Sequence, residues 1–266
     1  MKESLFFIKR IIIASIIFFL GGASLNCYAV NPELTIITDK APGVSVSHGL
    51  TKLTDALLAK KISFEIIESV KEAKGKWIIV TGLASGTGEA ARLLKAGGHS
   101  VPSTAEALTI WKSKKNDTPL WVISGSDDRG LMYALLDVAN RIGWSADKNE
   151  PMSAVKEITE KPAVSERAIS IYTMNRTYWE SRLYDEAYWA KYLDMLAQNR
   201  FNTLAVIFGY ENGGFLAPCY PYFFDVEGFP DVTMVGITPQ QQQHNLDAFN
   251  RLIQICLLYT SDAADE

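Results

Sequence analysis

Between residues 30 and 162, short apolar runs alternate with stretches in which apolar residues recur every three or four positions. The stretch 47–61 has apolar residues at 50, 53, 57 and 58, which is the spacing of one helix face. The stretch 76–82 instead contains a continuous apolar run, typical of a buried strand. This alternation predicts a small α+β domain. Its expected strands are 34–40, 76–82, 104–113 and 118–125, and its expected helices are 47–61, 88–97 and 126–144.

The helix expected over 126–144 carries the clearest pattern in the chain. Asp127 or Asp128 can cap its first turn, because a short acidic side chain accepts a hydrogen bond from the unpaired backbone N–H groups there. One face then carries apolar residues, and Gly143 is the expected stop. The residues of that face are Leu131, Leu135, Val138 and Ile142.

After residue 144 the pattern changes. The segment 145–166 is polar and contains two prolines, which favours a linker or domain edge. Beyond it, the order strand, helix, strand, long aromatic loop, helix is that of the beginning of a β/α barrel. The expected elements are strand 167–176, helix 185–201 with Tyr188, Tyr192, Met195 and Leu196 inward, strand 202–210, loop 211–236 and helix 238–255.

The first 29 residues have the layout of a secretory signal peptide. Lys2, Lys9 and Arg10 precede an uncharged apolar stretch, and Ala29 stands at a cleavage position. The alternative is an uncleaved membrane anchor, but the apolar stretch is shorter than the roughly 20 residues that a span needs. We therefore expect a secreted or periplasmic protein with no stable membrane span after cleavage.

The last residues, 256–266, resemble translated sequencing adapter. Residues 256–265, CLLYTSDAAD, match the translation of a transposon-end adapter used in DNA sequencing libraries codon for codon. The alternative is a genuine terminus. We expect the natural sequence to end near Ile255, with the barrel truncated after one β/α unit and part of the next.

Composition narrows the class of protein. The chain is 48% hydrophobic and 21% charged with a formal net charge of −4, which is ordinary for a globular protein and does not favour nucleic-acid binding. The three His residues (48, 99 and 244) and the three Cys residues (27, 219 and 256) are scattered, so neither a metal site nor a disulfide framework is expected. The turn with Gly82, Gly86 and Gly88 lacks the spacing of a dinucleotide-binding motif, and we expect no cofactor.

Two segments carry a resemblance to known families. The segment 125–144, GSDDRGLMYALLDVANRIGW, resembles the end of the small α+β domain that precedes the catalytic barrel in secreted β-N-acetylhexosaminidases and α-glucuronidases. The segment 166–176, ERAISIYTMNR, is similar to the hexosaminidase pattern in which one arginine opens the first barrel strand and another closes it. It departs from that pattern at Ala168, where Gly is usual, and at Tyr172, where an acid is frequent.

The resemblance covers about residues 30–255 and implies a fold and a function. The implied fold is a small α+β sandwich (β-hexosaminidase domain 2-like) followed by a truncated (β/α)8 TIM barrel. The implied function is hydrolysis of hexosaminide or glucuronide bonds in a polysaccharide or glycan; the alternative is a non-catalytic carbohydrate-binding protein of the same architecture. The expected segments are a signal peptide (1–29), an α+β domain (30–162), the first barrel units (163–255) and the adapter-derived tail (256–266).

The resemblance also implies carbohydrate-binding residues. Arg167 is expected to hydrogen-bond sugar hydroxyls through its forked guanidinium, the alternative being a structural ion pair with an acid such as Glu166. The catalytic carboxylates of such enzymes come from later strands, so none is assigned and the chain is expected to be inactive. The candidate substrate-binding residues are Arg167, Asn175, Arg176, Trp179 (or its neighbour Tyr178), Glu211 and Asn212.

Overall fold

The computed structural model describes residues 31–147, 149–170, 176–206, 220–257 and 259. Residues 31–266 form one compact unit. The predicted signal peptide lies outside the described residues. None of the helices that the structure describes combines the length and apolar character that a membrane crossing requires.

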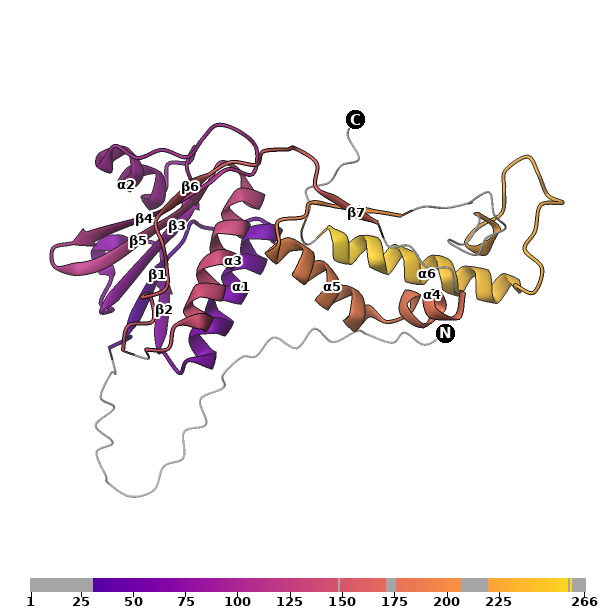
Figure 1. The fold of residues 1–266 in the computed structure, drawn as a ribbon, viewed down its shortest axis with the longest axis horizontal. Helices are drawn as coiled ribbons and strands as arrows, with labels where there is room; N and C mark the ends of the chain where they lie inside the picture. Colours follow the sequence, from indigo (N-terminus) through magenta and orange to yellow (C-terminus); the bar gives the residue numbers. More distant parts are fainter. Residues whose placement is uncertain (1–30, 148, 171–175, 207–219, 258, 260–266) are drawn as a thin grey trace, which may run out of the picture. The chain divides into compact units, whose positions relative to one another are not determined.

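The first part of the unit is built on a six-stranded mixed sheet (Figure 1). Its strand order is β2-β1-β3-β5-β4-β6, in which β2, β1, β3 and β5 are parallel and β4 is antiparallel to both of its neighbours. The strands are β1 (Leu34–Ile37), β2 (Phe64–Ile67), β3 (Trp77–Leu83), β4 (Leu108–Lys115), β5 (Thr118–Gly125) and β6 (Ile158–Glu160).

Helices cover both faces of this sheet. α1 (Val44–Ala59) and α3 (Asp128–Trp144) lie side by side on one face, and α2 (Glu89–Gly97) covers the other, with the short 3-10 helix η1 (Val70–Glu72) between β2 and β3 (Figure 1). The parallel strands are therefore apolar on both faces, as buried strands must be. In β3, Ile79 belongs to the core beneath α1 and α3, whereas Ile78 and Val80 belong to the core beneath α2.

The pattern of α3 is confirmed with one correction. Asp127 is the N-cap, and its carboxylate accepts a hydrogen bond of 2.8 Å from the backbone N–H of Gly130. The predicted apolar face is buried. Gly143 does not stop the helix, which continues to Trp144 and is capped at Ser145, whose N–H bonds to the carbonyl of Arg141.

The prediction of a linker over 145–166 is wrong in part, because this segment adds β6 to the sheet edge. Met152 and Val155 are buried there. The hydroxyls of Thr109 and Thr159 lie 3.2 Å apart across the β4–β6 pair. Three-residue β6 is too short to show a sequence period, so the prolines and charges around it dominate the pattern.

The second part contains a parallel strand pair with helices between. β7 (Ala168–Ser170) pairs with β8 (Thr203–Ala205), Ala168 opposite Thr203. This is one β/α/β unit, as the sequence predicts. The closed TIM barrel and the domain boundary near residue 162 stay predictions. The remaining elements are α4 (Arg176–Leu183), α5 (Glu186–Gln198), η2 (Tyr220–Tyr222) and α6 (Pro239–Cys256).

Two expectations for these helices need correction. Residues 176–183 form helix α4, which the sequence analysis does not predict. In α5, Met195 is 48% exposed, and the inward face is carried by Trp189, Leu193, Leu196 and Ala197. Tyr188 and Tyr192, which the sequence predicts to face inward, are only partly buried and lie beside this face. The helix expected over 238–255 is present as α6, in which Thr238 is the N-cap and Pro239 occupies the first turn.

The described part of the predicted tail packs against the rest of the unit. Cys256 ends α6 and is half-buried, and burial raises the pKa of its thiol to about 11. Tyr259 is 8% exposed; its ring lies edge-on to His48 and its hydroxyl donates to the carbonyl of Ala190 at 3.3 Å. The adapter origin of this segment stays a prediction.

Candidate functional site

Arg167 and Tyr178 are the predicted site residues whose side-chain contacts the structure describes. Tyr178 lies on α4, is exposed, and its ring centroid lies 3.8 Å from the guanidinium carbon of Arg182. Asn175, Glu211 and Asn212 lie outside the described residues. Arg176 and Trp179 belong to α4, but their side chains are outside the description as well. The site is therefore built outward from Arg167, which directly precedes β7.

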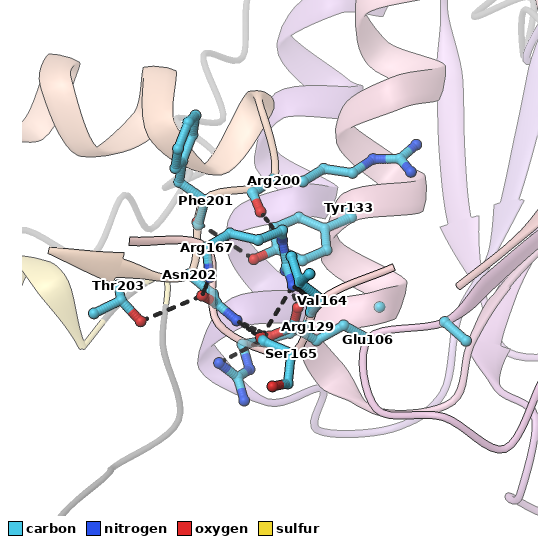
Figure 2. Close-up of polar contacts among 12 residues, drawn as sticks. Glu106, Arg129, Tyr133, Val164, Ser165, Arg167, Arg200, Phe201, Asn202 and Thr203 are labelled. Atoms are coloured by element: carbon cyan, nitrogen blue, oxygen red, sulfur yellow. Dashed lines mark hydrogen bonds and ion pairs between the residues drawn. The ribbon is translucent and has the colours of Figure 1, made fainter. Parts of the chain in front are cut away.

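The guanidinium of Arg167 is fully engaged by the chain itself (Figure 2). It forms an ion pair with the carboxylate of Glu106. Its Nε donates to the carbonyl of Arg200 at 2.6 Å, and its Nη1 donates to the carbonyls of Val164 and Ser165 at 2.9 and 3.1 Å. This is the geometry of the structural ion pair considered as the alternative, with Glu106 in the place suggested for Glu166.

Glu106 is the centre of the arrangement. The residue is 5% exposed, and its carboxylate also pairs with Arg129 at 3.0 Å and accepts from the amide of Asn202 at 3.0 Å. Its backbone has φ 61°, the left-handed region that costs an ordinary residue about 1–2 kcal/mol. Its own N–H donates to Asp127 at 2.8 Å. We call Glu106, Arg129, Arg167 and Asn202 the Glu106 cluster.

Asn202 joins the two short strands within this cluster. Its side-chain oxygen accepts from the backbone N–H of Arg167 at 2.8 Å, and its backbone N–H donates to the carbonyl of Arg167 at 3.1 Å. The side-chain amide also donates to the carbonyl of Ser165 at 2.8 Å. Residues 167 and 202 are thus locked opposite each other where β7 and β8 begin.

Tyr133 of α3 closes the cluster from the side of the six-stranded sheet. Its hydroxyl donates to the carbonyl of Phe201 at 3.4 Å (Figure 2). Burial, followed by the nearby charge of Glu106, raises its pKa to about 12, against the opposing charges of Arg167 and Arg129. The phenol therefore stays protonated at physiological pH and acts as a donor.

The Glu106 cluster lies at the amino ends of β7 and β8. In β/α barrels the chemistry takes place at the carboxyl ends of the strands, whereas the amino ends serve stability. The carboxyl ends lead from Ser170 and Ala205 toward the segments that contain Asn175, Glu211 and Asn212. The contacts of Arg167 hold the amino ends of β7 and β8 together, and its binding of a sugar stays a prediction.

Sequence reasoning misses Glu106. It lies within TAEALTIW, which the apolar pattern assigns whole to a strand, although β4 begins only at Leu108. Its ion-pair partner Arg167 is 61 positions away, so no local pattern signals the pair.

A second polar and aromatic group lies between α4, η2 and α6. Asn245 is fully buried; its amide donates to the carbonyl of Tyr222 at 2.9 Å and its oxygen accepts from the hydroxyl of Tyr184. The ring of Tyr184 stacks on His244, with centroids 4.5 Å apart. The adjoining pocket is small, about 160 Å³. These contacts hold helices together and leave little room for a ligand.

The glycine-rich turn between β3 and α2 is filled by a carboxylate of the chain itself. A Cβ at Gly82 would lie 2.6 Å from Oδ2 of Asp39, and one at Gly88 would lie 1.9 Å from Oδ1. Burial raises the pKa of Asp39 above its usual value, and a hydrogen bond with the backbone of Leu83 opposes the shift. No group of three or more potential metal ligands occurs among the residues that the structure describes.

The described elements define a mixed α/β fold, and comparison with known proteins finds a solved structure of similar fold. No protein-family model matches the chain, and no curated protein matches it. Among solved structures it is similar to a GH138 enzyme targeting pectin rhamnogalacturonan II, with a TM-score of 0.58 and 17% sequence identity. The match covers 86% of this chain and 30% of that one, so the chain spans less than a third of that enzyme's length. At this identity the likeness shows the fold alone.

Proposed function

We propose that the chain is part of a glycoside hydrolase that acts on a glycan. The observation that carries this proposal is the structural likeness to a glycan-targeting enzyme over 86% of the chain. That coverage is more than residues 31–162 alone can supply, so the likeness extends beyond the six-stranded sheet into the β7–β8 part.

The arrangement of β7 and β8 supports the proposal physically. They are parallel neighbours separated by helices, the repeating unit of a (β/α)8 TIM barrel. The Glu106 cluster fixes their amino ends, which leaves the segments after their carboxyl ends to face a substrate. We propose Asn175, Arg176, Trp179, Glu211 and Asn212 as carbohydrate-binding residues there. The catalytic acids belong, in this proposal, to later strands, either as a carboxylate pair or as one acid that acts with an acetamido group of the substrate.

Hexosaminide and glucuronide linkages are the substrates that we propose first, in an exported protein whose signal peptide is 1–29. The mature N-terminus of the protein exported by a bacterial host gives a direct check of the export proposal. Cleavage after Ala29 supports it, and recovery of the intact N-terminus in the membrane fraction supports the anchor instead.

The test of function begins with the source DNA, read across codon 255 from a library that uses no transposon-end adapter. The longest open frame is expressed and assayed on aryl β-N-acetylhexosaminides and aryl α-glucuronides, and then on a panel of plant and bacterial glycans. Hydrolysis of any of these supports the proposal. Glycan binding without hydrolysis supports the carbohydrate-binding alternative, and neither binding nor hydrolysis contradicts both.

A further inference from the structure

A pocket of about 490 Å³ opens at the carboxyl edge of the six-stranded sheet. It lies where β3 and β5, two adjacent parallel strands, end, and it is bounded by α2 and the segment that follows this helix. Open α/β sheets bind ligands at this edge because loops, not strands, form its surface. The pocket lies outside the Glu106 cluster, and none of the predicted site residues lines it.

The lining combines an apolar floor with polar side chains, among which Lys95 carries a positive charge. Leu94 and Val101 contribute the apolar part. No Asp or Glu is among the described residues that line the pocket, although the whole chain has a net charge of −4. The polar lining residues are Ser85, Lys95, His99, Ser100, Ser103 and Ser126.

Contacts outside the pocket hold several of these residues in place. The imidazole of His99 stacks on the indole of Trp111, with ring centroids 4.1 Å apart. The hydroxyl of Ser126 donates to the carbonyl of Thr104 at 2.9 Å and accepts from the N–H of Ala107. The carbonyl of Ser100 accepts from Thr109 at 3.0 Å. The wall is therefore fixed to β4 and to the end of β5 before any ligand arrives.

The turn after α2 also requires its glycines. A Cβ at Gly97 would lie 2.2 Å from the ring of Trp111, and Gly98 ends the helix with φ 71°, in the left-handed region. The Trp111 ring therefore packs against Gly97, and the same ring stacks on the imidazole of His99. Lys95, in the last turn of α2, lines the same pocket as His99.

We propose that this pocket is an accessory binding site for an anionic monosaccharide unit, a sugar that carries a carboxylate or a phosphate. Lys95 pairs with the anionic group, the His99 N–H and the serine hydroxyls bond to sugar hydroxyls, and the apolar floor meets the carbon face of the ring. A volume of this size accommodates a ligand of one or two sugar rings. The choice of a sugar rests on the proposed function, whereas the negative charge of the ligand follows from the pocket alone.

The test titrates the full chain with glucuronate, glucose 6-phosphate, glucose and inorganic phosphate, followed by ligand-observed NMR. Lys95→Met removes the cation and retains most of the side-chain length. Lys114→Met is the matched control, because Lys114 is an exposed lysine near the opposite end of β4. Melting temperatures of both variants show whether the fold is intact, since Lys95 also complements the negative end of α2.

The proposal is supported if glucuronate or glucose 6-phosphate binds and glucose binds much more weakly. It also requires that Lys95→Met lowers the affinity for the anionic sugar by about 10-fold or more and that Lys114→Met does not. The two anionic sugars distinguish a carboxylate from a phosphate as the preferred group. Equal binding of glucose, or no binding of either anionic sugar, overturns the proposal. Inorganic phosphate binding as tightly as glucose 6-phosphate overturns the sugar assignment. Glycosidase assays are independent of all these outcomes, so failure here is distinguishable from failure of the proposed function.

Discussion

At the scale of single residues, Glu106 holds the Glu106 cluster together, although no local sequence pattern marks its position. Its left-handed backbone and the burial of its charge both lower the stability of the folded chain. Contacts of its carboxylate with two arginines and with the amide of Asn202 offset this loss. The sequence identifies Arg167 as special because it opens a predicted strand. The sequence does not identify the partner, because ion pairs between distant positions depend on the folded chain and leave no period in the sequence.

Glu106→Gln is expected to destabilise the chain by about 3 kcal/mol, because it leaves two partly buried guanidinium groups without their negative partner. Glu68→Gln is the control: its pair with Lys40 is exposed at both ends, and its loss costs at most about 1 kcal/mol. Urea unfolding of both variants measures the difference. Equal midpoints for the two would show that the Glu106 cluster contributes no more than a surface pair.

At the scale of elements, the long periodic helices were predictable, whereas the short strands β2 and β6 were not. α3 and α6 combine an apolar stripe with a capping residue, and the sequence predicts both helices. β2 and β6 have four and three residues, too few to establish a period. The sequence pattern does not distinguish Gly130 from Gly143 in α3. In the structure, Gly130 lies against the backbone of Ala107, whereas Gly143 faces open space.

Gly130 and Gly143 provide a matched pair of substitutions within α3. A Cβ at Gly130 would lie 2.3 Å from the carbonyl oxygen of Ala107, whereas a Cβ at Gly143 meets nothing within 4 Å. Gly143→Ala is expected to stabilise the chain by about 0.5–1 kcal/mol through helix propensity. Gly130→Ala is expected to lower the melting temperature despite the same propensity gain. Thermal unfolding followed by circular dichroism measures the melting temperature of each variant. A change of the same sign in both melting temperatures would contradict the packing argument.

The contact between α1 and α5 is expected to make stability depend on pH. Asp194 of α5 accepts hydrogen bonds from His48 at 3.0 Å and Lys52 at 2.8 Å, both of α1, and from Gln198 at 2.9 Å. Burial alone would raise the pKa of Asp194, but the bonds and charges of His48 and Lys52 outweigh it and hold the pKa below its usual 3.8. A carboxyl with a depressed folded pKa stabilises the fold above its unfolded pKa, and this contribution is lost as the pH falls through the folded pKa.

Melting temperatures between about pH 7 and pH 2 test this contact. The parent chain is expected to lose stability below pH 3.8 more steeply than Asp194→Asn, which lacks the titrating group. Asp117→Asn, a change of an exposed residue in the β4–β5 turn, is the control and should follow the parent. A parent curve parallel to that of Asp194→Asn would rule out the contact as a source of the acid sensitivity.

At the scale of the whole molecule, the resemblance of a few motifs leads the sequence analysis to expect a glycoside hydrolase, and a solved structure of similar fold is a GH138 enzyme. Two residues of the segment 125–144, which carries part of that resemblance, have structural roles in the fold. Arg129 pairs with Glu106, and a Cβ at Gly125 would lie 2.1 Å from the backbone of Leu131. The kind of sugar was not predictable, because the residues after β7 and β8 that would contact it form no recognisable motif.

The chain is expected to show no glycosidase activity. The proposed barrel needs eight strands, of which the described residues supply β7 and β8, and the proposed catalytic acids belong to later strands. Purified protein is incubated with aryl glycosides beside a blank preparation from cells that lack the gene. Turnover above the blank would contradict the expectation and would place the catalytic acids within this sequence.

The chain is also expected to self-associate. Within the described residues β8 pairs with β7 in a sheet of two strands, and an apolar strand with one open edge is a template for further pairing. Light scattering after size exclusion measures the mass of the particles. A monodisperse monomer of the parent chain would contradict this expectation.

The carboxylate of Asp39, seated against Gly82 and Gly88, has a consequence for evolution. Because a Cβ at position 88 would overlap Asp39, substitutions at the two positions are not independent. Among descendants of a common ancestor, a larger residue at position 88 should be accepted only after position 39 has become smaller. An alignment deep enough to show co-variation should therefore report positions 39 and 88 as a coupled pair, although 49 positions separate them.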